Sequence, residues 1–290
     1  MPVNTIRFGI QHRMLQYLER LSGDPPDVVY HYTTQDAFRG ILQTKVIWAS
    51  NALYLTDSSE INYGIDVLDA VLADRIAETP AYAQAALTAR WNEVTAGRQN
   101  ESIYLAAFSS ERDDLSQWRA YGGDSGYCLA FETATLDLIR HAAGSAGFFL
   151  RCLYEEDEQR AAALKLFDLL EPELDSMIPA VRRNVFNALV IMTAACVKHR
   201  SFRPEREWRL VFLAPDQPSV KQQFRSGRSF LIPYITIPIV VPGADPYLRE
   251  VLVGPTPHPQ LAGPATWNAC VSHGWHVDKV TVTQIPFRSW

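Results

Sequence analysis

Residues 205–212 read Glu-Arg-Glu-Trp-Arg-Leu-Val-Phe, and polar and apolar residues alternate along the second half of this stretch. Successive side chains of a β-strand point to opposite faces of a sheet, so Trp208, Leu210 and Phe212 share one face. Glu207 and Arg209 share the opposite face. We therefore expect a strand whose aromatic and aliphatic side chains are buried, while Glu207 and Arg209 face a cleft or solvent.

Outward from this strand, turn residues and hydrophobic periodicity divide the chain into further elements. Strands are expected at residues 28–33, 46–49, 103–109, 127–132, 148–154, 207–213, 230–235, 237–241, 250–253 and 277–285. Helices are expected at residues 10–21, 35–43, 57–78, 81–95, 115–121, 133–142, 155–170, 178–199 and 259–273. This order predicts a mixed α+β fold with two small, mainly antiparallel sheets.

No repeat, low-complexity tract or long linker divides the chain, so we expect a single domain over residues 1–290. An N-terminal helical segment is expected at residues 1–27. The sheet core is expected to combine residues 28–154 with 200–290. A helical insertion is expected between these parts, at residues 155–199.

The composition limits the classes of protein that remain. With 290 residues, 47% of them hydrophobic, the chain can form a core without disulfides or a structural metal. A formal net charge of −5 argues against a constitutive nucleic-acid scaffold, which must neutralise phosphates. The four widely spaced cysteines are expected to be buried and free. Without a signal core or a membrane-spanning stretch, we expect a cytoplasmic protein with no membrane partner.

Familiar catalytic motifs are absent: there is no GxGxxG, GxxxxGK[ST], HExxH or GxSxG. The candidates are polar residues within apolar strands. Glu205 and Glu207 precede Arg209, a pattern more often produced by a solvated strand face with an ion pair. His31 lies in such a strand, where a histidine is more often a hydrogen-bonded core residue than a catalyst. Ser109 ends another strand, where its hydroxyl binds a ligand or caps a turn.

Two aromatic residues in the short helix expected at 115–121 form a further candidate. Trp118 and Tyr121 are spaced i, i+3 and flank Arg119, so they can form one aromatic wall. Such a wall is usually core packing. Next to Gly122-Gly123 it can also flank a flat ligand.

Short motifs in a fixed order between about residues 28 and 286 resemble a large bacterial family of unknown function, DUF2971. They are Tyr30-His31-Tyr32-Thr33-Thr34, Ile47-Trp48-Ala49-Ser50, Asp57-Ser58-Ser59-Glu60, Ala107-Phe108-Ser109-Ser110, Leu115-Ser116-Gln117-Trp118-Arg119-Ala120-Tyr121-Gly122, residues 126–131 and Glu205-Arg206-Glu207-Trp208-Arg209. The resemblance is specific because several motifs contain tryptophan. Family members often carry Asn-Asp where this chain has Thr56-Asp57. The family label names no activity.

A second resemblance is to the ADP-ribosyltransferase fold, whose signature is a histidine on an early strand, a serine at the end of a middle strand and Glu-x-Glu on a late strand. His31, Ser109 and Glu207 match these positions. The resemblance implies an ADP-ribosyltransferase-like core that binds NAD as a substrate. His31 would hold a ribose, Glu207 would bind the nicotinamide ribose hydroxyl, and Glu205 would assist an acceptor. The implied catalytic residues are Glu207 and Glu205, and the implied NAD-binding residues are His31, Tyr32, Ser109, Trp118, Arg119, Tyr121 and Arg209.

Breaking the nicotinamide–ribose bond develops positive charge on the ribose, so a fixed carboxylate would stabilise the transition state without a metal. Arg209 would oppose protonation of Glu207. We therefore expect an ADP-ribosyltransferase or NAD glycohydrolase of bacterial defence or toxin type. A nucleotide ligand is expected, and the acceptor is a protein, a nucleic acid or a small molecule.

Two alternatives remain open. The first is a catalytically silent module that binds a nucleotide or partner in a phage-defence or toxin–antitoxin system. The second is an unrelated hydrolase or nuclease in which Glu205, Glu207, Asp57 and Glu60 hold a hard metal. However, the spacing of Asp57 and Glu60 is already explained by a helix capping box.

Overall fold

The computed structural model describes residues 13, 16–54, 59–95, 103–123, 125–142, 147–174, 179–213, 221–227 and 229–286. Ten strands form one sheet: β1 (Val28–Thr34), β2 (Val46–Asn51), β3 (Ile103–Ser109), β4 (Gly126–Glu132), β5 (Gly147–Arg151), β6 (Glu207–Leu213), β7 (Gln223–Ser226), β8 (Leu231–Pro238), β10 (Glu250–Val253) and β12 (Val280–Val282). A second sheet pairs β9 (Tyr247–Leu248) with β11 (His276–Val277).

The strand order of the large sheet is β12-β10-β4-β1-β3-β2-β8-β7, and β6 joins β3 to β5. All of its pairs are antiparallel except β10 with β12, which confirms a mixed, mostly antiparallel α+β fold. The expectation of two small sheets is wrong. Strands far apart in the sequence, such as β2 and β8, pair directly and join both ends of the chain into one sheet.

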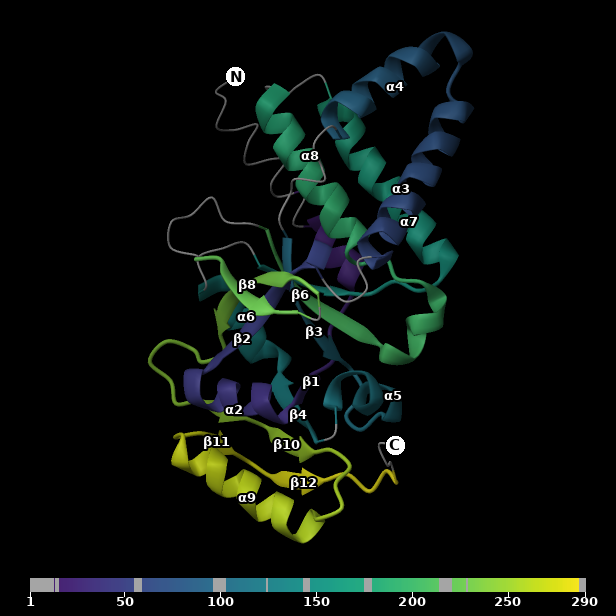
Figure 1. The fold of residues 1–290 in the computed structure, drawn as a ribbon. Coiled ribbons are helices and arrows are strands. Elements are labelled where there is room, and N and C mark those ends of the chain that lie inside the picture. The colour runs from purple at the N-terminus through teal and green to yellow at the C-terminus, as the bar shows by residue number, and fades with distance from the viewer. Residues whose placement is uncertain are drawn as a thin grey trace.

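Four long helices cover one face of the sheet (Figure 1): α3 (Ser59–Glu78), α4 (Ala81–Thr95), α7 (Glu156–Leu170) and α8 (Pro179–Ala194). Trp91, Phe167 and Phe186 pack between these helices, and the same cluster includes Leu105 and Val211 from the sheet. The segment expected as an insertion at 155–199 therefore packs with α3 and α4, which come from an earlier part of the chain.

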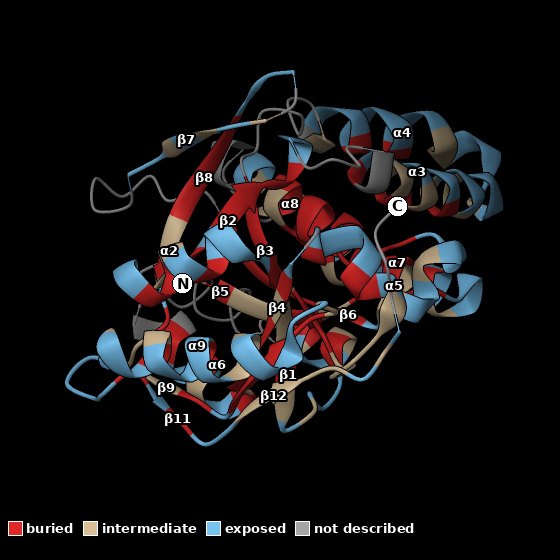
Figure 2. Ribbon diagram, turned by 60° about the horizontal axis from the view of Figure 1, so that its bottom comes forward, coloured by how far each residue is buried: buried red, intermediate tan, exposed pale blue. Residues whose placement is uncertain are grey.

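Shorter helices cover the opposite face: α2 (Gln35–Thr44), α6 (Thr133–Ala142) and α9 (Pro259–Ser272). This second cluster contains Trp208, Leu210 and Phe212, all buried, which confirms the alternation predicted for β6. Figure 2 shows buried positions along the central strands and exposed positions on the outer sides of α4 and α9. None of the helices in the described part of the chain is long and apolar enough to cross a bilayer.

Most elements lie where they are expected, but helix α8 ends at Ala194 and does not continue to residue 199. After this point the backbone forms a tighter turn, in which Cys196 N–H donates to Thr193 O at 3.0 Å. Val197 then forms an isolated parallel bridge with Leu153, and Lys198 N–H donates to Leu153 O at 3.0 Å. These tertiary hydrogen bonds override the apolar periodicity of the segment.

Three other elements differ from expectation. The strands expected at 230–235 and 237–241 form the single strand β8, because β2 pairs with it continuously from Tyr234 to Pro238. The helix expected at 115–121 is α5 (Leu115–Gln117) followed by the π-helix η3 (Trp118–Gly122). The strand expected at 277–285 splits into β11 and β12, which belong to different sheets.

All four cysteines are buried and free, as expected. The expected N-terminal helix is described at residues 16–22. Residue 57, which begins the expected capping box, lies outside the described part of the chain.

Candidate functional site

A gap opens in the sheet where β1 and β2 diverge along the same edge of β3. At one end of β3, Leu105 pairs with Ser50 of β2. At the other end, Ser109 pairs with Tyr30 of β1. Between these points, residues 106–108 have no described strand partner on this edge, although β6 pairs with the whole of the opposite edge.

A cavity of about 210 Å³ occupies this gap. Its walls come from β1, β2 and β3, from the α5–η3 turn, from the turn before β6, and from β7. The lining residues are Tyr30, His31, Tyr32, Trp48, Ser50, Leu105, Ala106, Ala107, Phe108, Gln117, Tyr121, Glu205, Glu207 and Arg225. His31, Tyr32, Tyr121, Glu205 and Glu207 were predicted from the sequence, so five expected site residues meet in one place.

A buried group of charges reaches the cavity through Glu205 and Glu207, which line it. Lys198 Nζ lies 2.5 Å from Glu205 Oε2 and 2.7 Å from Glu207 Oε2, so one ammonium joins both carboxylates. Arg209 binds the Glu207 carboxylate through Nε at 2.8 Å and Nη2 at 2.9 Å. Burial raises the pKa of Glu207, but the charges of Arg209 and Lys198 outweigh it and lower this pKa to about 2. Glu207 is therefore ionised at neutral pH.

Arg209 does not face a cleft or solvent, and this expectation from strand alternation is wrong. Its side chain is 2% exposed and its Nη1 donates to Ala195 O at 2.6 Å, directly after α8. Alternation places Arg209 on the correct face of the sheet, but the helical layer covers that face. Glu207 is also buried, yet it lines the cavity.

His31 reaches across the gap between β1 and β3. Its Nδ1 lies 2.9 Å from Ala107 O, which can only accept a hydrogen bond, so Nδ1 carries a proton. Burial lowers the pKa of His31, and the bond to Ala107 offsets only part of this effect. The ring is therefore neutral at pH 7, and Nε2 is an acceptor. Among the described residues, no hydrogen-bond partner is present at Nε2.

Ser109 lies behind the cavity and fixes the turn before β6. Its hydroxyl donates to Glu205 O at 2.7 Å and accepts from Glu111 N–H at 3.0 Å. The side chain is buried and does not line the cavity. Ser109 therefore positions the backbone of Glu205 and is not in contact with the cavity itself.

The predicted aromatic wall is not formed by both of its members. Trp118 is 1% exposed, packs edge-on against Tyr32 and donates from Nε1 to Asp113 at 2.7 Å. It belongs to a separate apolar cluster, and Arg119 is exposed outside the cavity. The π-helical turn explains this separation, because its wider turn rotates residues spaced i, i+3 away from one another. Tyr121 alone lines the cavity.

Several residues that line the cavity or bind its lining carboxylates were not predicted as site residues. Lys198 was missed because it was placed inside a helix, and Arg225 because β7 was not recognised. For Trp48 and Ser50, the sequence contained a pattern that could have identified them. Their neighbours on β2, Ile47 and Ala49, are apolar and buried, so alternation turns Trp48 and Ser50 to the opposite face.

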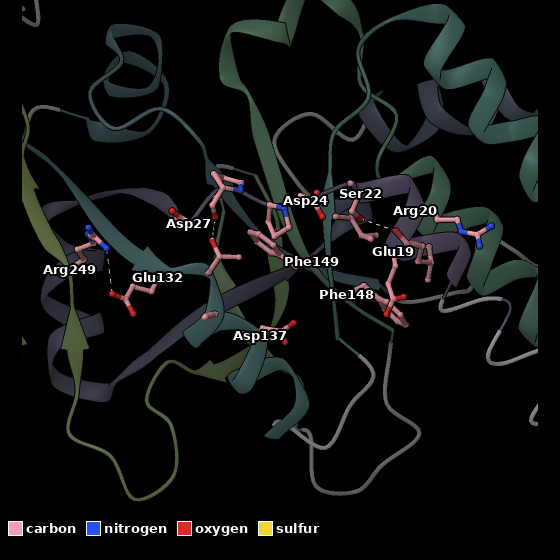
Figure 3. A pocket seen from close by; sticks show the side chains of 17 residues that line it. Glu19, Arg20, Ser22, Asp24, Asp27, Glu132, Asp137, Phe148, Phe149 and Arg249 are labelled. Atoms are coloured by element: carbon pink, nitrogen blue, oxygen red, sulfur yellow. Dashed lines mark hydrogen bonds and ion pairs between the residues drawn. The ribbon is translucent and has the colours of Figure 1, made fainter.

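A larger cavity lies elsewhere and has a volume of about 920 Å³. Figure 3 shows carboxylates spread around it, with Phe148 and Phe149 on its wall and Glu132 paired with Arg249. In the described parts of the chain, no group of three histidine, cysteine or acidic side chains is placed to hold a metal ion. This cavity lacks the convergent buried polar groups found in the gap beside β3.

The geometry also bears on the metal-dependent alternative. Lys198 Nζ already occupies the position between Glu205 and Glu207 where a shared cation would bind. Asp57 lies outside the described residues, and the side chain of Glu60 is not described.

A comparison with protein families finds one matching model, described as a protein of unknown function (DUF2971), over residues 117–210. This match covers roughly a third of the chain and includes Gln117, Lys198, Glu205 and Glu207. It confirms the family resemblance over this segment. No curated protein and no solved structure matches the chain.

Proposed function

We propose that the chain binds NAD in the cavity beside β3 and cleaves its nicotinamide–ribose bond, as an ADP-ribosyltransferase-like enzyme. One observation carries this proposal: a neutral histidine from β1 and the Glu-x-Glu carboxylates before and within β6 line the same gap in the sheet. An acceptor nitrogen and ionised carboxylates suit the hydroxyls of a ribose and the positive charge that develops on it.

The size of the cavity indicates which part of the dinucleotide it can enclose. Small-molecule sites usually measure about 300–1,000 Å³, and this cavity measures about 210 Å³. It would therefore enclose the nicotinamide riboside half, while the remainder of NAD would extend past its mouth. Tyr121, which is 42% exposed, would contact the nicotinamide ring.

In the proposed reaction, the bond between ribose C1′ and the pyridinium nitrogen breaks and its electron pair stays with nicotinamide. The developing positive charge on the ribose would be stabilised by Glu207, whose position is fixed by Arg209 and Lys198. An acceptor hydroxyl, amine or water then bonds to C1′ and gives its proton to Glu205. Water as acceptor makes the protein an NAD glycohydrolase, and a macromolecule makes it an ADP-ribosyltransferase.

Release of free nicotinamide from NAD tests this proposal. Glu207→Gln should lower the rate by on the order of 100-fold or more, the usual scale for losing one pre-organised electrostatic group. Glu205→Gln provides a second variant at a partly exposed position, in case Glu207→Gln does not fold. The control is Glu93→Gln, an exposed glutamate on α4 that should release nicotinamide at the parental rate. Equal rates in the parent and in folded Glu207→Gln or Glu205→Gln would remove that residue from the mechanism.

A catalytically silent nucleotide-binding module is a second candidate, and one observation favours it. Three N–H donors from Lys198 and Arg209 already bind the Glu207 carboxylate, so much of its charge is neutralised before any ligand enters. NAD binding by calorimetry without release of nicotinamide would select this function over the first.

A cytoplasmic role in bacterial defence or toxicity would follow from the enzymatic function, because consumption of NAD or modification of a macromolecule harms a cell. Cellular NAD after induced expression of the parent and of Glu207→Gln would test this role. A fall in NAD with the parent alone supports it. If neither chain lowers cellular NAD, transfer of ADP-ribose to a macromolecule would be tested with labelled NAD.

A further inference from the structure

Three side chains that the proposed reaction does not use lie together at the cavity. Trp48 and Ser50 of β2, and Arg225 of β7, all line it. Register places them on one face, because Ser50 pairs with Tyr234 of β8 and Arg225 pairs with Ile232, two residues earlier on the same strand. Arg225 Nη2 donates to Ser50 Oγ at 3.2 Å, so the guanidinium is held beside the hydroxyl.

Arg225 differs from the other enclosed arginines. Arg75, Arg112 and Arg209 each bind a carboxylate directly. Among the described residues, no carboxylate lies within ion-pair distance of Arg225, although the side chain is partly buried. A guanidinium stays protonated in proteins, and a partly buried charge without a counter-ion is unfavourable. The cavity therefore presents a positive charge that an anionic ligand can neutralise.

An aromatic surface lies next to this charge. Trp48 stacks on Tyr234 with ring centroids 4.4 Å apart and is held in place by this contact. It is nevertheless 49% exposed, which is unusual for the largest apolar side chain. An indole fixed on one side and open to solvent is suited to stacking on a flat heterocycle.

We infer that Arg225 and Ser50 bind a phosphate group of a nucleotide and that Trp48 stacks on one of its rings, which makes the site selective for nucleoside phosphates over nucleosides. A guanidinium offers two parallel N–H donors to phosphate oxygens, and the serine hydroxyl offers a third. This inference rests on the nucleotide ligand of the proposed function, but not on cleavage of that ligand.

A comparison of two ligands with two proteins isolates the phosphate contact. The ligands are nicotinamide mononucleotide and nicotinamide riboside, which differ only by the phosphate, and the proteins are the parent and Arg225→Gln. Calorimetric titration should show that the phosphate raises affinity for the parent at least about tenfold. In Arg225→Gln this ratio should fall to near one, since the riboside loses little when the guanidinium is removed.

Matched variants separate this effect from a change in net charge or in folding. Arg39→Gln removes the same charge from an exposed position on α2 and should keep the parental ratio. Arg225→Lys keeps the charge without the planar pair of donors and should give an intermediate ratio. Trp48→Ala should weaken both ligands while leaving their ratio unchanged, because nicotinamide, the one aromatic ring in each of them, is the ring that Trp48 would stack on. Thermal melting of each variant provides the check on folding.

The outcomes for binding and for cleavage are distinct. An unchanged phosphate ratio in folded Arg225→Gln, or no preference for the phosphate in the parent, overturns the inference even if NAD is cleaved. A phosphate preference that depends on Arg225 supports the inference even if no nicotinamide is released. In that case only the proposed reaction fails.

Discussion

At the scale of single residues, Glu207 combines deep burial with an ionised carboxylate. Without this charge, Lys198 keeps its ion pair with Glu205, whereas Arg209 loses its ion pair with Glu207. Breaking a buried pair in this way typically lowers stability by about 3–5 kcal/mol. Glu207→Gln should therefore be less stable than the parent at pH 7 by about that amount.

The low pKa of Glu207 predicts how the stability difference between the parent and Glu207→Gln changes with pH. The pKa is lowered to about 2 in the folded chain, against an ordinary value of 4.5 for a glutamate. A group whose folded pKa is depressed contributes stability above its unfolded pKa, and this stability is lost as the pH falls toward the folded value. The difference in unfolding free energy between the parent and Glu207→Gln should therefore narrow from pH 5 to pH 3.

Urea denaturation at pH 7, 5, 4 and 3 measures this effect. Glu78→Gln, which changes an exposed glutamate at the end of α3, serves as the control and should follow the parent at every pH. A constant difference between the parent and Glu207→Gln across this range would show that Glu207 does not titrate as described.

Single residues also show where sequence reasoning succeeds. His31 lies on β1, Glu207 begins β6 and Glu205 ends the turn before it, and all three line one cavity. Lys198 and Arg225 were not foreseeable in the same way. Lys198 depends on a helix end that is fixed by Leu153. Arg225 depends on the β7–β8 hairpin, which reaches the cavity because β8 pairs with the distant strand β2.

At the scale of elements, Gly64 lets α3 approach the end of α8. A β-carbon at this position would overlap the backbone carbonyl of Ala194. Alanine usually stabilises a helix relative to glycine, but here the clash reverses the sign. Gly64→Ala should lower the free energy of unfolding by about 1–3 kcal/mol, the usual range for overpacking.

A second helical glycine provides a matched comparison. Gly40 lies within α2, and a β-carbon there would meet no atom within 4 Å. Gly40→Ala should therefore raise the free energy of unfolding by roughly 0.5–1 kcal/mol. Urea denaturation of both variants measures the contrast. Equal stability of Gly64→Ala and Gly40→Ala would mean that α3 and α8 are less closely packed than described.

Elements with strong local signals were predicted with their observed bounds. Strands β3, β6 and β10 and helix α6 are bounded by turns or caps, and their hydrophobic periods match their type. The end of α8 was wrong because its apolar pattern continues beyond Ala194, while hydrogen bonds to Leu153 decide where the helix stops. Local periodicity contains no information about such a partner.

At the scale of the whole molecule, the site depends on how β1 and β2 share one edge of β3. The sequence predicted antiparallel strands at both ends of the chain. It did not predict that β1 and β2 would both pair with β3, with no described strand partner for residues 106–108 on the edge between them. Pairing between distant strands sets this arrangement. The cavity is therefore a property of the assembled sheet, and no single motif encodes it.

Filling the gap tests this view of the molecule. Ala107 lines the cavity and is partly exposed. Its neighbour Ala106 also borders the cavity, but its side chain belongs to the close-packed cluster of the opposite face and is 3% exposed. Ala107→Leu should keep the chain folded and abolish stabilisation by ADP-ribose, which in the parent should reach about 2.7 kcal/mol at a ligand concentration 100 times Kd.

Ala106→Leu should behave in the opposite way: overpacking should destabilise it by about 1–3 kcal/mol, while ADP-ribose should still stabilise it. Denaturation with and without the ligand measures both variants. Full stabilisation of Ala107→Leu by ADP-ribose would place the ligand outside the cavity, because a leucine here would fill part of the space that Ala107 lines.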